Sequence, residues 1–157
     1  DQGGAAAITL LGRNVEKVRG LGADLQQATP CSVHCGTLGE DLEHALETHD
    51  IVVQGTPVGM YPDSVEDTPI AAEWLRPNQV IFDMVYRPLK TRLIQEAEAA
   101  GCVTILGYEM LLHQAVLQFE GWTGNKAPVG VMREALLSAL RSQGQPQGTR
   151  GARKEEA

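Results

Sequence analysis

Short apolar runs alternate along the chain with segments whose apolar residues recur at helical spacing. The runs are nearly continuously apolar, which is typical of strands buried on both faces of a parallel sheet. Strands are predicted at residues 8–11, 32–34, 51–54, 80–84 and 103–106. Helices are predicted at residues 14–27, 38–48, 69–74, 89–100, 109–122 and 128–141. This alternation predicts an α/β fold in which helices cover both faces of a doubly wound parallel sheet.

Length and composition predict one domain followed by a tail. The 157 residues suffice for one ordinary domain, predicted at residues 1–141, and the nearly apolar-free residues 142–157 are predicted to be disordered. A net charge of −7 argues against a nucleic-acid surface, and no apolar run is long enough for a membrane span. Free thiols at Cys31, Cys35 and Cys102 would fit a reducing cytoplasm, and their spacing predicts no metal site.

The loops that follow the predicted strands are where a ligand is expected. In an open parallel sheet, ligands bind beyond the carboxyl ends of the strands. The chain has four such loops, at residues 12–14, 55–60, 83–86 and 107–109.

The first of these loops carries positive charge where a dinucleotide-binding fold places the adenosine ribose. Gly12, Arg13 and Asn14 follow the strand, and Lys17 lies one helical turn further on. A carboxylate at this place would accept the 2′-hydroxyl of NAD and repel the 2′-phosphate of NADP, and the chain has none there. A guanidinium can pair with a phosphate, and Asn14 can cap the helix. The alternative is a solvated surface helix that begins with two cations, against the helix dipole.

The other loops give weaker signals. Thr56 and Pro57 could face a cofactor or could form only a tight turn. Tyr86 could contact a ligand or leave its hydroxyl in water, and Asp83 could simply cap the turn that follows it. Gln114 lies on the helix after residue 107, directed toward the strand ends, although a lone glutamine on a helix is usually solvated.

Taken together, the loops resemble the C-terminal half of the shikimate dehydrogenase family, over about residues 8 to 141. The resemblance rests on motifs that occur in the family's order and at matching separations. They are G-R-N at 12–14, G-T-P-V-G-M at 55–60, D-M-V-Y-R-P-L-K-T at 83–91, G-Y-E-M-L-L-H-Q-A at 107–115 and F-E-G-W-T-G at 119–124. Gly12 stands where the family has Asn, and Gln54 with Gly55 replaces an Asn-Ala pair.

The resemblance implies NADP-dependent reduction of 3-dehydroshikimate to shikimate, in the chorismate pathway of aromatic amino-acid biosynthesis. It also implies a Rossmann-like fold and a set of binding residues. These are Arg13, Asn14 and Lys17 at the adenosine 2′-phosphate, Thr56, Pro57 and Met60 along the cofactor, Val85 and Gly107 beside the nicotinamide, and Tyr86 and Gln114 at the substrate.

The start of the chain departs from the family. The family has a glycine-rich turn, a helix and then its second strand, whereas here Gly3 and Gly4 lead almost directly to Ile8. The first strand and nearly all of the first helix are therefore expected to be missing, which would leave open strand edges in the middle of the sheet. We expect that the chain does not fold alone.

The family's catalytic Lys and Asp lie in its other domain, so the resemblance assigns no catalytic residue here. Lys90 and Asp83 do not take those roles. The expected partners are a small-molecule substrate, the missing N-terminal catalytic domain and a second copy of the chain in a homodimer. By itself the chain is expected to be inactive.

Three alternatives remain open at this point. The chain could come from a relative on the same scaffold that acts on quinate or uses NAD. It could be a non-catalytic dinucleotide-binding module, for which Tyr86 and Gln114 would be unnecessary. It could also be part of a fused enzyme in which a dehydroquinate dehydratase precedes it.

Overall fold

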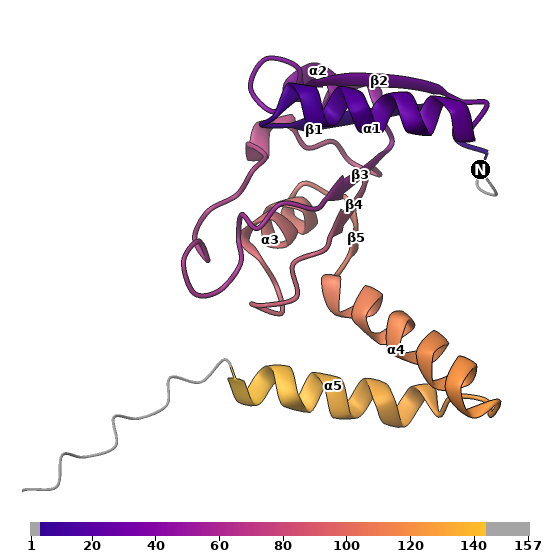
Figure 1. Ribbon diagram of the computed structural model, residues 1–157. Helices are drawn as coiled ribbons and strands as arrows, with labels where there is room; N and C mark the ends of the chain where they lie inside the picture. Colours follow the sequence, from indigo (N-terminus) through magenta and orange to yellow (C-terminus); the bar gives the residue numbers. More distant parts are fainter. Residues whose placement is uncertain (1–3, 144–157) are drawn as a thin grey trace, which may run out of the picture.

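The computed structural model describes residues 4–143, and Figure 1 shows their path. The strands are β1 (Ala7–Gly12), β2 (Ser32–Thr37), β3 (Ile51–Gln54), β4 (Val80–Asp83) and β5 (Val103–Ile105). The helices are α1 (Val15–Ala28), α2 (Leu42–Thr48), the short 3-10 helix η1 (Ala72–Trp74), α3 (Arg92–Ala99), α4 (Gly107–Thr123) and α5 (Val129–Gln143). The tail that was predicted to be disordered lies, from residue 144 onward, outside the described residues.

Each predicted strand is present, but some helices begin later than predicted because side chains hold the preceding turn. Before α2, the carboxylate of Asp41 accepts hydrogen bonds from the backbone N of Thr37 at 2.7 Å and from its hydroxyl at 3.2 Å. Before α3, Thr91 is the N-cap, and its Oγ1 accepts a hydrogen bond from Ile94 N at 3.3 Å. The predicted helix at residues 69–74 is reduced to η1.

The strands are parallel, as predicted, but they form two sheets. β1 pairs with β2, and β4 pairs with β3 on one side and β5 on the other. The break between β1 and β3 lies where a doubly wound sheet of order 3-2-1-4-5-6 has its first strand. The predicted open edges are therefore present on β1 and β3, and Ile51 and Val53 on β3 are 63% and 58% exposed. Near this break, a side-chain hydrogen bond joins Thr9 Oγ1 on β1 to His49 Nε2, just before β3, at 3.0 Å.

The hydrophobic core lies with the three-stranded sheet. Its buried members come from α2, α3, β4 and the segment around η1: Leu46, Ile70, Leu75, Ile81, Leu93 and Ala97. In the unit of β1, α1 and β2, by contrast, the buried residues are Gly22 and Cys31. The firmly packed part of the molecule therefore supports the ends of β3 and β4.

The last two helices extend away from the sheets, and α5 turns back beneath them (Figure 1). An ion pair between Glu109 and Arg133 joins the start of α4 to α5. The hydrogen bond that Arg133 donates within this ion pair holds the pKa of Glu109 below its usual value. Leu117 and Trp122 on α4 are 71% and 81% exposed. Within residues 4–143, none of the helices is long and apolar enough to cross a membrane.

Candidate functional site

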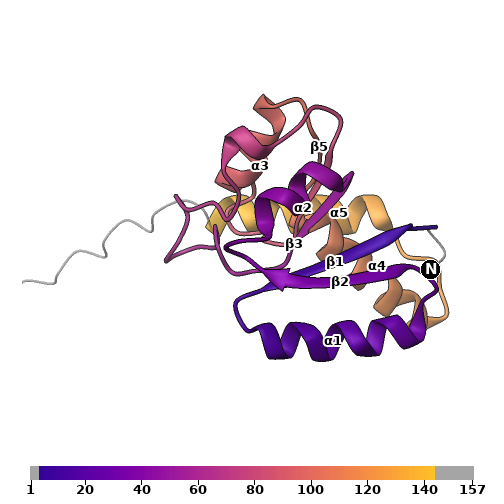
Figure 2. The same cartoon turned by 90° about the horizontal axis from the view of Figure 1, so that it is seen from above.

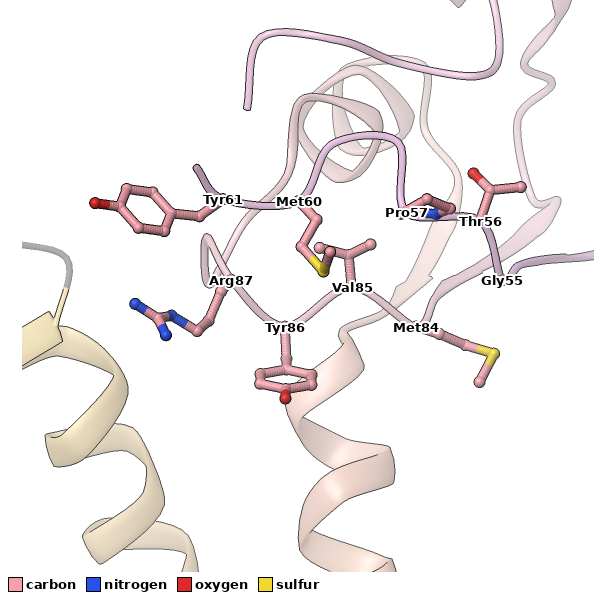
Figure 3. Close-up of a pocket in the computed structure, with 9 residues that line it drawn as sticks. All are labelled: Gly55, Thr56, Pro57, Met60, Tyr61, Met84, Val85, Tyr86 and Arg87. Atoms are coloured by element: carbon pink, nitrogen blue, oxygen red, sulfur yellow. The ribbon is translucent and has the colours of Figure 1, made fainter. Parts of the chain in front are cut away.

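The loops after β3 and β4 line an open pocket of about 410 Å³, called the strand-end pocket below. Its lining comes from two segments that face each other in Figure 3: Gly55, Thr56, Pro57, Met60 and Tyr61 after β3, and Met84, Val85, Tyr86 and Arg87 after β4. Ligand pockets in proteins commonly have volumes of about 300–1,000 Å³ and mainly apolar linings. This pocket has both properties, and it lies at the carboxyl ends of parallel strands, where the sequence places the ligand.

Five of the binding residues expected from the sequence line this one pocket. They are Thr56, Pro57, Met60, Val85 and Tyr86. Met60 is 45% exposed and Tyr86 is 38% exposed, so both present large apolar surfaces to solvent beside the buried Val85. The structure thus brings together residues that are up to thirty positions apart in the sequence.

Backbone contacts hold the two walls of the pocket against each other. Met84 N donates to Gln54 O at 2.9 Å where the walls begin, and Tyr61 N donates to Arg87 O at 2.7 Å where they end. The guanidinium of Arg87 also lies 5.2 Å from the centre of the Tyr61 ring, a cation–π contact at the rim. Gly59 adopts a φ of +88°, which allows the first wall to turn back toward the second.

Gly107, the first residue of α4, packs against the second wall. A Cβ atom at this position would lie 2.5 Å from Val85 O and 2.6 Å from Met84 O, closer than real Cβ atoms approach backbone. Gly107 does not line the pocket, yet it packs against the backbone of Val85, the other residue that the resemblance places beside the nicotinamide. Only glycine lets α4 begin at this distance from the loop.

Asp83 is fully buried at the end of β4 and caps the turn, as one interpretation of the sequence had it. Its Oδ1 accepts a hydrogen bond from Val85 N at 3.0 Å. Burial raises the pKa of this carboxyl, while hydrogen bonds from Thr91, from Val85 and from Gln54 oppose the shift. Asp83 does not line the pocket.

The cationic group lies apart from the pocket, at the start of α1. Asn14 is the N-cap, since its Oδ1 accepts a hydrogen bond from Lys17 N at 3.0 Å. Arg13 and Lys17 are exposed, and neither is ion-paired within residues 4–143. The loops after β1, β3 and β4 lie on the same side of the molecule, on the left in Figures 1 and 2. The pocket and the cations therefore share one edge of the fold.

The residues that end β1 and lead into α1 include no carboxylate, since Gly12, Arg13 and Asn14 stand there. Gly12 is the register partner of Thr37 on β2, and Asp41 accepts hydrogen bonds from the backbone N and the hydroxyl of Thr37. The acidic side chain that a dinucleotide-binding fold uses for the ribose 2′-hydroxyl of NAD is therefore not found among residues 12–14.

Some residues are placed differently from the simplest expectation. Gln114 is exposed on α4 and does not line the strand-end pocket, so its role at a substrate stays a prediction. Tyr61, Met84 and Arg87 line the pocket but were not singled out in the sequence. Met84 and Arg87 stand in the quoted motif after β4, and Tyr61 directly follows the motif after β3, so position in the loops was the only available signal.

Among the described residues, no three His, Cys, Asp or Glu side chains gather as a metal site.

Comparison with known proteins gives consistent matches. Residues 107–137 match the family model described as Shikimate 5'-dehydrogenase C-terminal domain. Shikimate dehydrogenase (NADP(+)) of Methanopyrus kandleri is 40% identical over 139 residues, covering 88% of this chain and 48% of the relative. The enzyme of the same name from Symbiobacterium thermophilum is 42% identical over 146 residues, covering 91% of this chain and 49% of the relative. The chain thus spans about half the length of the curated relatives it matches.

Solved structures agree in fold. A crystal structure of shikimate dehydrogenase in complex with NADP+ has a TM-score of 0.77 at 32% identity, covering 85% of this chain and 47% of that one. Quinate dehydrogenase from Corynebacterium glutamicum in complex with NAD has a TM-score of 0.78 at 29% identity, covering 87% of this chain and 48% of that one. These neighbours confirm the Rossmann-like α/β fold. By sequence and by fold, the chain is similar to the C-terminal half of shikimate dehydrogenases.

Proposed function

We propose that this chain is the NADP-binding half of an NADP-dependent shikimate dehydrogenase, which interconverts 3-dehydroshikimate and shikimate. One observation carries the proposal: the strand-end pocket and the two cations Arg13 and Lys17 lie along the same edge of parallel strands. A dinucleotide crosses this edge in doubly wound folds, with its adenosine beyond one strand and its reactive ring beyond others. One bound NADP would reach both places.

The residues at the start of α1 fit a 2′-phosphate. Arg13 offers a planar set of donors, Lys17 offers a second positive charge, and neither is engaged by a carboxylate within residues 4–143. Asn14 uses its oxygen to cap the helix, which leaves its amide N–H groups free to donate. The helix N-terminus adds its own partial positive charge. This combination favours NADP over NAD.

The strand-end pocket fits the other end of the cofactor. In this proposal Thr56, Pro57 and Met60 line the cofactor, and Val85 with Gly107 borders the nicotinamide. A mainly apolar lining with a few polar groups suits a flat ring with one amide substituent. Tyr86, which lines the pocket and is 38% exposed, would contact the substrate, and Gln114 on α4 would hydrogen-bond to the substrate hydroxyls.

The bound nicotinamide supplies or accepts the hydride. The residues of this chain would hold the ring and exclude water from one of its faces. Reduction of a carbonyl also needs a proton at the oxygen, and the described lining of the strand-end pocket holds no histidine, carboxylate or lysine, although it holds the hydroxyls of Tyr61 and Tyr86. From the resemblance to the family, we propose that the catalytic Lys and Asp lie outside this chain and that the chain alone is inactive.

Two further points belong to the proposal. All three cysteines are free thiols, which supports a reducing compartment and hence the cytoplasm. Partners would be the small-molecule substrate, the domain that carries the catalytic residues and, in a homodimer, a second copy. Quinate dehydrogenase from Corynebacterium glutamicum in complex with NAD has a similar fold, and the lack of a carboxylate among residues 12–14 argues against NAD as the cofactor here.

The decisive assay uses the full-length protein that contains this chain, with shikimate or quinate as substrate and NADP or NAD as cofactor. We expect the highest kcat/KM for shikimate with NADP, at least about tenfold above shikimate with NAD, because one charge-assisted hydrogen bond is worth that factor. Appearance of the reduced cofactor at steady state is the measured signal. Equal values for both cofactors, or a preference for quinate, would refute this assignment.

A further inference from the structure

A buried polar network joins the two walls of the strand-end pocket from behind. Gln54 ends β3, Asp83 ends β4, and the two are partners in the strand register. Their side chains are 5% and 0% exposed, and Gln54 Nε2 donates to Asp83 Oδ1 at 3.3 Å. Neither side chain lines the pocket. A buried amide and a buried carboxylate need such mutual satisfaction, because an unpaired polar group in the interior is costly.

Gln54 holds the first wall. Its Nε2 donates to Val58 O at 3.1 Å, and its Oε1 accepts a hydrogen bond from Thr56 N. One amide therefore bridges both sides of the turn that carries Thr56 and Pro57 into the pocket. Because the side chain is buried and fully engaged, the turn is tied to β3 rather than to solvent.

Asp83 and Thr91 hold the second wall. Asp83 Oδ1 accepts a hydrogen bond from Val85 N at 3.0 Å, and its Oδ2 accepts one from the hydroxyl of Thr91 at 2.6 Å. Thr91 is 1% exposed and is at the same time the N-cap of α3 through Ile94 N. The loop from residue 84 to residue 90 is thus fastened at both ends to one carboxylate.

The backbone hydrogen bonds between the two walls lie at the ends of the pocket, and the side-chain network connects the walls between those ends. Those bonds join Met84 to Gln54 and Tyr61 to Arg87, at the two ends of the pocket. Between these ends, Thr56 N and Val85 N are connected through the side chains of Gln54 and Asp83. The network lies beside the hydrophobic core, and its three side chains bond to each other, to the loops and to the start of α3.

We propose that Gln54, Asp83 and Thr91 are positioning residues that set the distance between the two walls and thereby the affinity for the cofactor. The proposal rests on the proposed function, since it takes NADP as the ligand of the strand-end pocket. It predicts that breaking the network weakens cofactor binding more than a general loss of stability would. Residues that position a binding loop without touching the ligand affect ligand affinity in this way, because a shift of about 1 Å in the loop is enough to lose contacts with the ligand.

The test compares Thr91→Val with Thr91→Ser in the full-length protein. Valine keeps the shape and removes the hydroxyl, whereas serine keeps the hydroxyl. We expect Thr91→Val to raise the Kd for NADPH, measured by fluorescence titration, by about tenfold, and Thr91→Ser to stay within about twofold of wild type. Ile81→Val on the same strand is the stability control, because it shortens a fully buried core side chain. It should lower the Tm and leave the Kd unchanged.

Gln54→Met provides a second variant should Thr91→Val fail to fold. It preserves side-chain length and removes the three hydrogen bonds of the amide, and it should raise the Kd for NADPH by a similar factor. The positioning role is overturned if these variants bind NADPH as wild type does, or if Ile81→Val weakens binding as much. A wild-type protein that does not bind NADPH would instead refute the proposed function, so the two failures are distinguishable.

Discussion

Arg13→Ala is expected to lower kcat/KM with NADP by about ten- to a hundredfold in the full-length protein, because a hydrogen bond to a charged group contributes about 1.5–3 kcal/mol. The value with NAD should hardly change, since NAD has no 2′-phosphate for the guanidinium to bind. The preference for NADP would then largely disappear. Steady-state kinetics with each cofactor at saturating shikimate measure the effect.

Arg19→Ala is the matched control for this prediction. Arg19 is also an exposed cation of α1, but it lies two residues beyond Lys17 and so on a different side of the helix. Its removal changes the net charge equally and should leave both cofactors unaffected. If Arg13→Ala had no effect, or if Arg19→Ala reduced the value with NADP as much, the interpretation of Arg13 as a phosphate ligand would be wrong.

Gly107→Ala is expected to destabilise the full-length protein by about 1–3 kcal/mol, the usual cost of forcing extra atoms into a packed place. The added methyl would lie 2.5 Å from Val85 O and 2.6 Å from Met84 O, and these are backbone atoms that cannot rotate away. Relief requires α4 to move away from the second wall of the strand-end pocket. Affinity for NADPH should therefore fall together with the free energy of unfolding, which denaturant titration measures.

Gly121→Ala offers the corresponding control on the same helix. An added Cβ at Gly121 meets nothing within 4 Å, and the residue is exposed. Alanine favours a helix over glycine by up to about 1 kcal/mol, so this variant should be as stable as wild type or more stable. Equal destabilisation by both substitutions would mean that the close contact at Gly107 is unimportant.

Much of the fold could be predicted because local signals agreed with tertiary structure. The apolar residues 51–53 with Gln54, followed by Gly55, predicted the bounds of β3 correctly. Asn14 correctly predicted the start of α1, because a side-chain oxygen at that place satisfies a free backbone N–H. The loops at strand ends were also sound guides, since strand direction alone fixes the edge at which they meet.

The remaining features depend on contacts between distant residues. The burial of Asp83 with Gln54 and Thr91, and the approach of Gly107 to Val85, arise only when β3, β4 and α4 come together. The late start of α2 was missed because Asp41 bonds to Thr37 in preference to extending the helix. Arg87 carried no sequence signal beyond its place in the motif after β4, since a cation beside a proline is usually a solvated loop residue.

The central claim is that the start of α1 and the strand-end pocket together bind NADP. The most direct measurement is fluorescence titration of the full-length wild-type protein with NADPH and with NADH under identical salt. The account predicts that NADPH binds at least about tenfold more tightly, because the two cofactors differ only in the phosphate that Arg13 and Lys17 would bind. Equal Kd values, or tighter binding of NADH, would contradict it.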